Sequence, residues 1–135
     1  MNLADKYSRG INPLVQLLDL EGATIDAHVA QLGIAIEAIG YQALIDSGMI
    51  ERDANRKSVK ERIDHLLLEV AGALDFDHAT FVQNFADTYN SVKHANRDIV
   101  GPEVKVENYR KGVTLLRAWV AVRLGVKKSV LVTRF

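Results

Sequence analysis

The sequence contains no cysteine and only two prolines among its 135 residues. The missing cysteines exclude a disulfide framework, a thiolate metal site and a cysteine nucleophile. Strand signals are also sparse, because runs of alternating β-branched residues and Asn-Gly or Asp-Gly hairpin turns are missing. The sequence lacks a glycine-rich phosphate loop, a Gly-x-Ser-x-Gly turn and a His-Glu-x-x-His motif, so nucleotide hydrolysis, esterase and zinc protease functions have no support.

No segment is suited to secretion or to a bilayer. The first ten residues have mixed charge and no apolar core, unlike a signal peptide. The most apolar long stretch, residues 27–45, contains His28, Gln31, Glu37 and Gln42, which a protein core can satisfy and a bilayer would penalise. With 48% hydrophobic residues, the chain can bury about two-thirds of its unfolded surface. We therefore expect one domain over residues 1–135 and, by default, a cytoplasmic location.

Charge is balanced over the chain but not along it. Residues 1–89 carry 7 basic and 14 acidic side chains, whereas residues 90–135 carry 10 basic and 3 acidic ones. The basic third could attract a polyanion, since phosphate binding is mostly electrostatic. The other interpretation, which we prefer, is that these cations solvate the last helix and pair with the acidic first half.

Apolar residues of helical period predict an all-α fold, an up-and-down four-helix bundle. We expect helices over residues 24–46, from Ser58 to Gly72 with Glu61 completing a capping box, from an Asp77 N-cap to residue 96, and over residues 107–124. A short extra helical turn should follow Asn12-Pro13, and the last ten residues should form an extended arm. The polar connection over residues 48–57 is the expected mobile loop.

Glu37 is the first unusual polar residue. It shares a stripe of the first long helix with Ala30, Gly33 and Gly40, small residues that would let another helix approach closely. A carboxylate that faces a packed neighbour needs a hydrogen-bond or ion-pair partner. A structural glutamate paired with an arginine from a later helix and a glutamate at a functional site are equally compatible with this pattern.

A second polar feature, which we call the polar seam, follows one side of the helix expected to begin at Asp77. Its members, spaced by four, three, four and three residues, are Gln83, Asp87, Asn90, His94 and Arg97. Any surface helix has a solvated side, but this one combines groups that bind phosphate oxygens and transfer protons near neutral pH. The remaining histidines lack a second ligand at metal-binding spacing, and we predict no metal.

The segment Phe81 to His94, FVQNFADTYNSVKH, resembles the signature helix of HEPN domains, particularly the Apea-like group, in which an arginine and a polar residue precede a histidine. The segment LGIAIEAI at 32–39 resembles the family's early helix, and LLRAW at 115–119 with LGV at 124–126 resembles its closing helix. The similarity covers about residues 13–126. It implies a four-helix bundle that dimerises, and in many members a metal-independent ribonuclease of toxin, anti-phage or RNA-processing systems.

The resemblance implies roles for particular residues. His94 matches the acid/base histidine and Asn90 matches the polar position, whereas the arginine position holds Tyr89, whose neutral phenol cannot replace a bidentate cation. Glu37, Tyr89 and Asp87 would be supporting residues. Lys93 or Arg97 would contact phosphate and compensate for the missing arginine. No cofactor is implied.

Three hypotheses remain open. The first is an Apea-like HEPN domain that binds RNA and cleaves it weakly or conditionally. The second is a catalytically degenerate HEPN bundle that serves dimerisation or partner binding, and the third is an unrelated helical domain. Expected partners are RNA, a second copy of the chain and, if the chain is a piece of a longer defence protein, the other domains of that protein.

Overall fold

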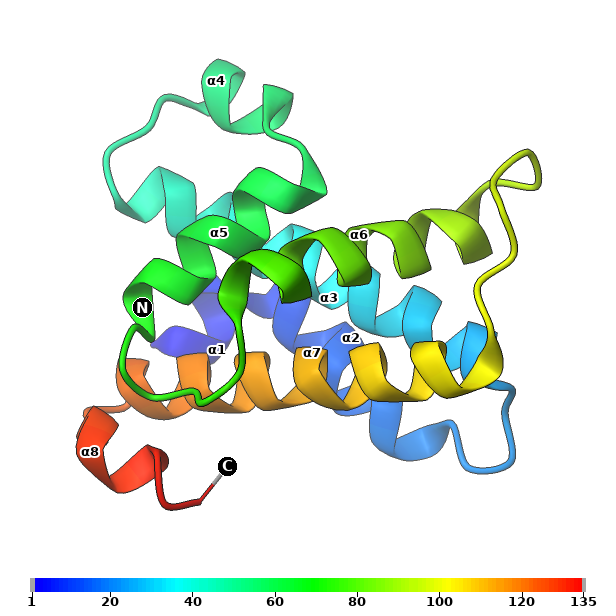
Figure 1. Ribbon diagram of the computed structural model, residues 1–135. Helices are drawn as coiled ribbons and strands as arrows, with labels where there is room; N and C mark the ends of the chain where they lie inside the picture. The colour runs from blue at the N-terminus through cyan, green and yellow to red at the C-terminus, as the bar shows by residue number, and fades with distance from the viewer. Residues whose placement is uncertain (1, 135) are drawn as a thin grey trace.

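The computed structural model describes residues 2–134 and is helical throughout, with no strand in that range (Figure 1). In chain order the elements are α1 (Leu3–Lys6), α2 (Ser8–Gln16), the 3-10 turn η1 (Leu17–Asp19), α3 (Ile25–Asp46), α4 (Glu51–Arg56), α5 (Val59–Glu69), α6 (His78–Lys93), α7 (Pro102–Arg123) and α8 (Lys128–Leu131). The all-α bundle predicted from the sequence is confirmed. No helix among the described residues is both long and apolar enough to cross a membrane.

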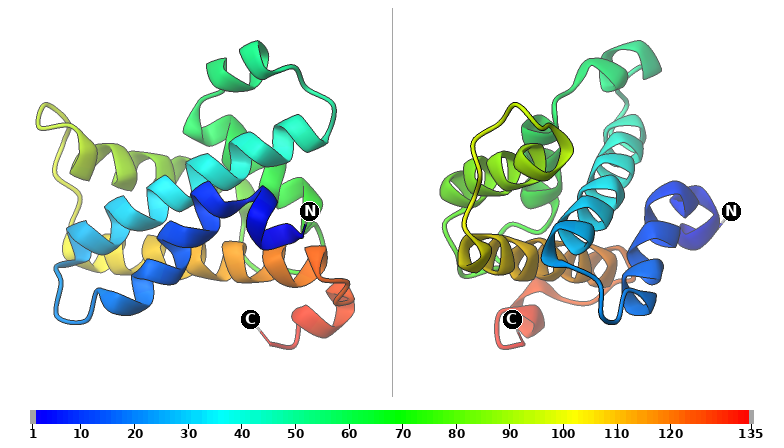
Figure 2. Two further views of the ribbon diagram at one scale, coloured as in Figure 1. Left: turned by 180° about the vertical axis from the view of Figure 1, so that it is seen from behind. Right: turned by 90° about the vertical axis from the view of Figure 1, so that its right-hand side faces the viewer.

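Helix α3 is the central element, and the views in Figure 2 show it between α2 and the other long helices. It contacts α2, α5, α6 and α7, and its side chains are apolar on nearly every side, as expected for a buried helix. Its fully buried side chains include Val29, Leu32, Ile36 and Ile39. The core of the domain therefore forms around α3, with Phe85 from α6 and Trp119 from α7 as large partners.

Three of the predicted helix starts are confirmed by their caps. The Thr24 hydroxyl accepts a hydrogen bond from the amide of Ala27, and the Asp77 carboxylate accepts one from the amide of Thr80. Ser58 and Glu61 form the predicted capping box, in which each side chain accepts from the other's backbone amide. These short polar signals succeed because they satisfy amides that the helix itself leaves unpaired.

The N-terminal prediction was wrong in its boundaries. Asn12 is not an N-cap, because α2 begins four residues earlier at Ser8 and contains Pro13 in its interior. Proline removes one hydrogen bond from the helix, yet α2 continues through Pro13 to Gln16. Gly10 lies so close to α3 that a Cβ there would overlap Cγ1 of Ile39.

Four other boundaries differ from the sequence prediction. The expected loop at 48–57 contains α4, whose Ala54 is fully buried, and the C-terminal arm is helical at α8, where Leu131 is buried. Helix α6 ends at Lys93 and α7 begins at Pro102, with Gly101 as its N-cap. Burial of Ala54 and Leu131 outweighs the local sequence in α4 and α8, and a proline at the first helical position starts α7 early. Helix α6 stops where His94 takes extended backbone angles.

The ends of α3, α5 and α7 are joined by a polar anchor that we define as Tyr7, Asp46, Glu69, Trp119 and Arg123. The Tyr7 hydroxyl donates to Asp46, and the Trp119 indole N–H donates to Glu69. Arg123 lies 2.6 Å from Oε1 of Glu69 and 3.6 Å from Oδ2 of Asp46. The anchor fixes the N-terminal segment to the bundle through hydrogen bonds as well as apolar contact.

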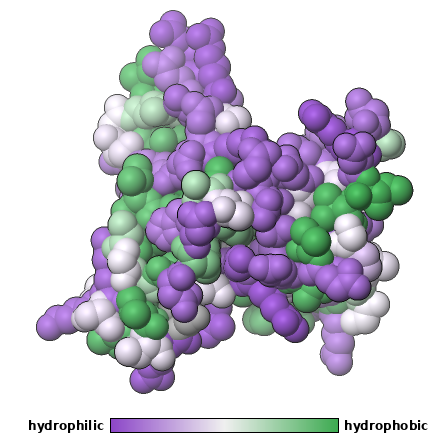
Figure 3. Space-filling view, viewed as in Figure 1, coloured by the Kyte–Doolittle hydropathy of each residue, from purple (hydrophilic) through white to green (hydrophobic). Residues whose placement is uncertain are grey.

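Some apolar side chains stay in contact with solvent where α6 is connected to α7. Ile99 in this connection is 94% exposed, and Val104 in the first turn of α7 is 45% exposed. On the face drawn in Figure 3, hydrophobic surface lies beside hydrophilic surface at this end of the molecule. The connection therefore offers both apolar and polar groups to a ligand.

We predict that Gly10→Ala destabilises the fold. The new Cβ would lie 2.9 Å from the backbone nitrogen of Ile39 and 3.0 Å from the carbonyl oxygen of Ala35, neither of which can move alone. Overpacking of this kind costs about 1–3 kcal/mol, against a gain of at most about 1 kcal/mol from replacing a helical glycine. The free energy of unfolding, measured in urea, should fall by about 1–2 kcal/mol.

Arg9→Ala is the matched control, since Arg9 is exposed on the same helix. We expect its free energy of unfolding to stay within about 0.5 kcal/mol of the wild type. A Gly10→Ala variant as stable as Arg9→Ala would contradict the close packing of α2 on α3.

Candidate functional site

Tyr89, which the resemblance places at the motif's arginine position, lies in the interior. Its side chain is only 3% exposed and covers Gly33, where a Cβ would overlap the ring atoms Cδ1 and Cε1. Gly33 does allow a close approach to α3, as predicted, and the group that approaches is the ring of Tyr89 from α6. The absence of a side chain at Gly33 opens the space that Tyr89 fills.

Glu37 is the polar partner of Tyr89. The Tyr89 hydroxyl donates a hydrogen bond of 2.8 Å to Oε2 of Glu37. Lys93 Nζ lies 3.5 Å from the same oxygen and 4.8 Å from the centre of the Tyr89 ring. The expected arginine partner is replaced by a tyrosine and a lysine from α6. We call Glu37, Tyr89 and Lys93 the internal triad.

Burial and the Glu37 carboxylate hold the Tyr89 phenol in its neutral form. Burial raises the pKa of Tyr89 above its ordinary value, and the hydrogen bond to Glu37 raises it further because a phenolate would face a carboxylate. Tyr89 is therefore a hydrogen-bond donor at neutral pH and cannot act as an anion or as a substitute cation. The motif position supplies packing and a proton, with no charge directed at a ligand.

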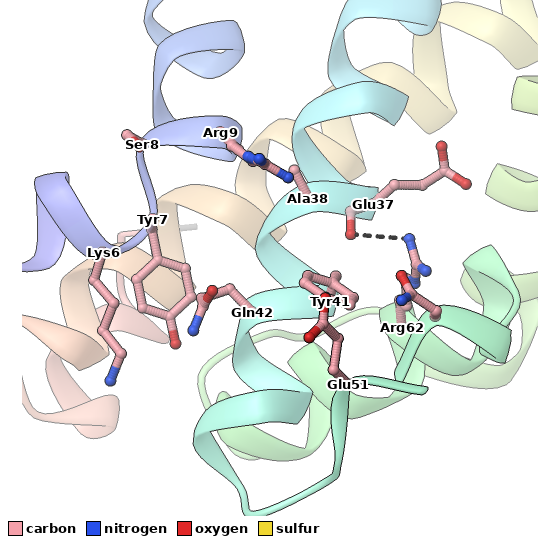
Figure 4. A pocket seen from close by; sticks show the side chains of 11 residues that line it. Lys6, Tyr7, Ser8, Arg9, Glu37, Ala38, Tyr41, Gln42, Glu51 and Arg62 are labelled. Atoms are coloured by element: carbon pink, nitrogen blue, oxygen red, sulfur yellow. Dashed lines mark hydrogen bonds between the residues drawn. The ribbon is translucent and has the colours of Figure 1, made fainter. Parts of the chain in front are cut away.

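A cavity of about 410 Å³ lies on the other side of Glu37, between α1, α2, α3, α4 and α5 (Figure 4). Arg62 lines it, donating through Nη1 to the carbonyl of Glu37 at 3.2 Å and through Nη2 to the carbonyl of Ala54 at 3.3 Å. The Arg62 guanidinium also lies 5.7 Å from the centre of the Tyr41 ring. Sequence reasoning missed these residues, because no local spacing connects Arg62 with α3.

Asp87, Asn90 and Arg97 lie together around a different hollow. They line a cleft of about 360 Å³ with Asp98 and Val100, where the end of α6 meets the connection to α7. We call this the α6 cleft. Three of the five polar-seam residues therefore lie together, but Arg97 does so from the turn after the helix and not from a stripe along it. The periodicity of a helix gave no signal for Asp98 or Val100.

His94 does not join these groups in a single site. It is the C-cap of α6, with φ −129° and ψ 119°, and its side chain is exposed. Its amide donates to the carbonyl of Asn90 at 3.0 Å, and its carbonyl accepts from the amide of Arg97 at 3.2 Å. It lines neither the cavity beside Glu37 nor the α6 cleft. The predicted site residues are thus divided between the internal triad, the α6 cleft and an exposed histidine at the helix end.

Ion pairs join the basic third of the chain to the acidic part. Lys93 pairs with Glu37, Lys105 with Asp26 at 2.6 Å, and Arg123 with Glu69. The preferred interpretation of the charge pattern is correct for these cations. Within residues 2–134, no ion pair is found for Arg97, Arg110, Lys127, Lys128 or Arg134. The same range contains no cluster of three or more potential metal-ligating His, Asp or Glu side chains.

A family model for Apea-like HEPN domains matches residues 21–130, which includes the internal triad, the α6 cleft and His94. The chain belongs to the Apea-like HEPN family. In the residue correspondence that the resemblance implies, this HEPN domain has Tyr89 in place of the motif arginine. Helices α1 and α2 precede the matched range, so Lys6 and Arg9 of the cavity beside Glu37 lie outside it. Comparison with curated proteins and comparison with solved structures gave no match.

We predict that Tyr89→Phe weakens the loss of stability at alkaline pH. The folded state raises the pKa of Tyr89 above the ordinary 10.0, so its contribution is complete below pH 10 and declines as the pH rises further. Phenylalanine cannot ionise, and the free energy of unfolding should fall less steeply above pH 10. At pH 7 the lost hydrogen bond should cost about 1 kcal/mol.

Urea unfolding of both proteins at about pH 7 and about pH 10.5 checks this prediction. The Tyr7→Phe variant is a useful comparison, since burial and Asp46 also raise the pKa of Tyr7. It should flatten the alkaline decline in the same direction. An unchanged slope in Tyr89→Phe would show that the folded state does not raise the pKa of Tyr89.

Proposed function

We propose that this HEPN domain binds single-stranded RNA at the C-terminal end of α6 and cleaves it weakly without a metal ion. The observation that carries the proposal is the exposed His94, which follows α6 directly and has Asn90 and Arg97 within four residues on either side. An imidazole can take a proton from a ribose 2′-hydroxyl and return one to the leaving oxygen. A cation beside the linkage can stabilise the phosphate charge that develops, and Lys93 directly precedes His94 in the chain.

The weakness of the reaction follows from Tyr89. A buried phenol that donates to Glu37 offers no positive charge to a phosphate, and removing one electrostatic stabiliser commonly costs about 10²–10³ in rate. Lys93 is also held by Glu37, which weakens its contact with a phosphate, and Arg97 lies in a cleft with two carboxylates. A role in toxin or anti-phage defence, and a cytoplasmic location, belong to the same proposal.

The burial of Tyr89 also favours a second candidate function. In that case the HEPN bundle has lost catalytic activity and serves as a dimerisation or partner-binding module. Its partner would be a second copy of the chain or another domain of a longer defence protein. It predicts a stable dimer by light scattering and no RNA cleavage. A strictly monomeric protein would contradict this candidate.

The first experiment is an RNA cleavage assay in EDTA with the wild type, His94→Ala and His78→Ala. His78 is the matched control, because it is a histidine at the opposite end of the same helix. We expect slow cutting by the wild type and His78→Ala, with 2′,3′-cyclic phosphate ends, and none by His94→Ala. Cutting that survives His94→Ala would remove the acid/base assignment.

The second experiment restores the arginine. The new guanidinium in Tyr89→Arg would lie beside Glu37 and would form an ion pair with its carboxylate, so the single substitution should raise cleavage little. In Tyr89→Arg combined with Glu37→Gln, the guanidinium is no longer held by a carboxylate. We expect the double variant to cut at least about tenfold faster than the wild type.

Circular dichroism and urea unfolding should first show that both variants are folded. If folded Tyr89→Arg and the double variant are both inactive, and His94→Ala equals the wild type, the binding-module candidate is favoured over the ribonuclease.

A further inference from the structure

The α6 cleft has the wrong charge for a phosphate. It is lined by two carboxylates, Asp87 and Asp98, against one guanidinium, Arg97, and one amide, Asn90. It also lies at the C-terminal end of a sixteen-residue helix, where unpaired carbonyl groups leave a partial negative charge. Both features favour a ligand that presents N–H donors and disfavour an anion.

The polar groups of the cleft are available to a ligand. Within residues 2–134, Arg97, Asp98 and the amide of Asn90 form no side-chain hydrogen bond or ion pair with the protein. Asp87 is held in place from one side, because Gln83 donates to its Oδ2 at 2.8 Å and Lys60 in turn donates to Gln83 at 2.7 Å. The Oδ1 atom of Asp87 has no partner among the described residues.

The cleft's volume, about 360 Å³, lies at the small end of the range of ligand pockets, about 300–1,000 Å³. It suits one nucleoside better than a peptide helix. Val100 adds an apolar surface against which the face of a base can pack. Single-stranded RNA presents unstacked bases that proteins bind through both the Watson–Crick and the Hoogsteen edges.

We propose that the α6 cleft binds one guanine base of the RNA, with Asp87 and Arg97 as the residues that determine specificity. This inference rests on the proposed RNA-binding function and names the base that is recognised. Guanine carries neighbouring N–H donors at N1 and N2, which match a carboxylate. Its O6 and N7 acceptors match a guanidinium fork. Adenine presents an acceptor at N1, which would face the Asp87 carboxylate and be repelled.

Neighbouring residues fit a base held in this position. Asp87 and Asn90 lie on α6 before His94, and Arg97 follows it, so a base in the cleft would place the adjoining ribose and phosphate near the exposed imidazole. Asp87 and Arg97 would select the base, and His94 would act on the neighbouring linkage. Residues of the polar seam would therefore perform both base recognition and cleavage at the same end of α6.

The test measures binding of the wild-type protein to fluorescent octauridines that are fully 2′-O-methylated, so that the internal nucleophile is blocked. One central position carries guanine, adenine, cytosine or hypoxanthine. We expect the guanine probe to bind about tenfold more tightly than the adenine probe, as one good bidentate contact allows. The hypoxanthine probe, which lacks the 2-amino group, should lie between them.

Asp87→Asn and Arg97→Gln should each reduce the guanine-to-adenine affinity ratio to within about twofold of one. Asp75→Asn is the matched control, since it removes an exposed carboxylate just before the opposite end of α6 and should leave the ratio unchanged. A ratio cancels any general loss of folded protein, because that loss affects all probes equally.

Three outcomes overturn the inference in distinguishable ways. Equal binding of all four probes would refute the guanine cleft while leaving RNA binding intact. Binding of none would refute the proposed RNA-binding function, and the guanine cleft with it. A guanine preference that Asp87→Asn retains would show that another part of the domain reads the base.

Discussion

The contact between α3 and α6 at Gly33 is the constraint on which the arrangement of polar groups depends. A glycine at this position removes the side chain that would otherwise separate the helices, and the Tyr89 ring occupies the space. Once the ring is fixed, its hydroxyl reaches Glu37, and Lys93 one turn later reaches the same carboxylate. The side of α6 with Asp87 and Asn90 is then directed to the cleft at the helix end.

This contact separates two kinds of polar residue that look alike in the sequence. Glu37, Tyr89 and Lys93 satisfy one another and stabilise helix packing. The polar side chains of the α6 cleft, apart from Asp87, lack such partners within residues 2–134. When a ligand removes water from them, only hydrogen bonds to that ligand can offset the free-energy cost of desolvation. Unpaired polar groups in a hollow are therefore better candidates for recognition than the motif position itself, which the bundle has taken into its interior.

Helix existence and the capped helix starts could be predicted because they depend on a few neighbouring residues, such as Ser58 with Glu61. Helices α4 and α8 could not be predicted, because their formation depends on the burial of Ala54 and Leu131 against the rest of the fold. The need of Glu37 for a partner was visible in the sequence, but the identity of that partner was not. The direction of its tyrosine partner depends on a glycine that lies 56 residues away along the chain, at position 33 against position 89.

The packing of α2 on α3 has a consequence for how the domain can be divided. The family match begins at residue 21, but Gly10 and the buried Tyr7 cover one side of the most apolar helix in the chain. A fragment cut to residues 21–130 would expose Ala35 and Ile39 to water and would lose the Tyr7 contact to Asp46. Such a fragment would expose an apolar surface and tend to aggregate, although it contains the whole range that the family model matches.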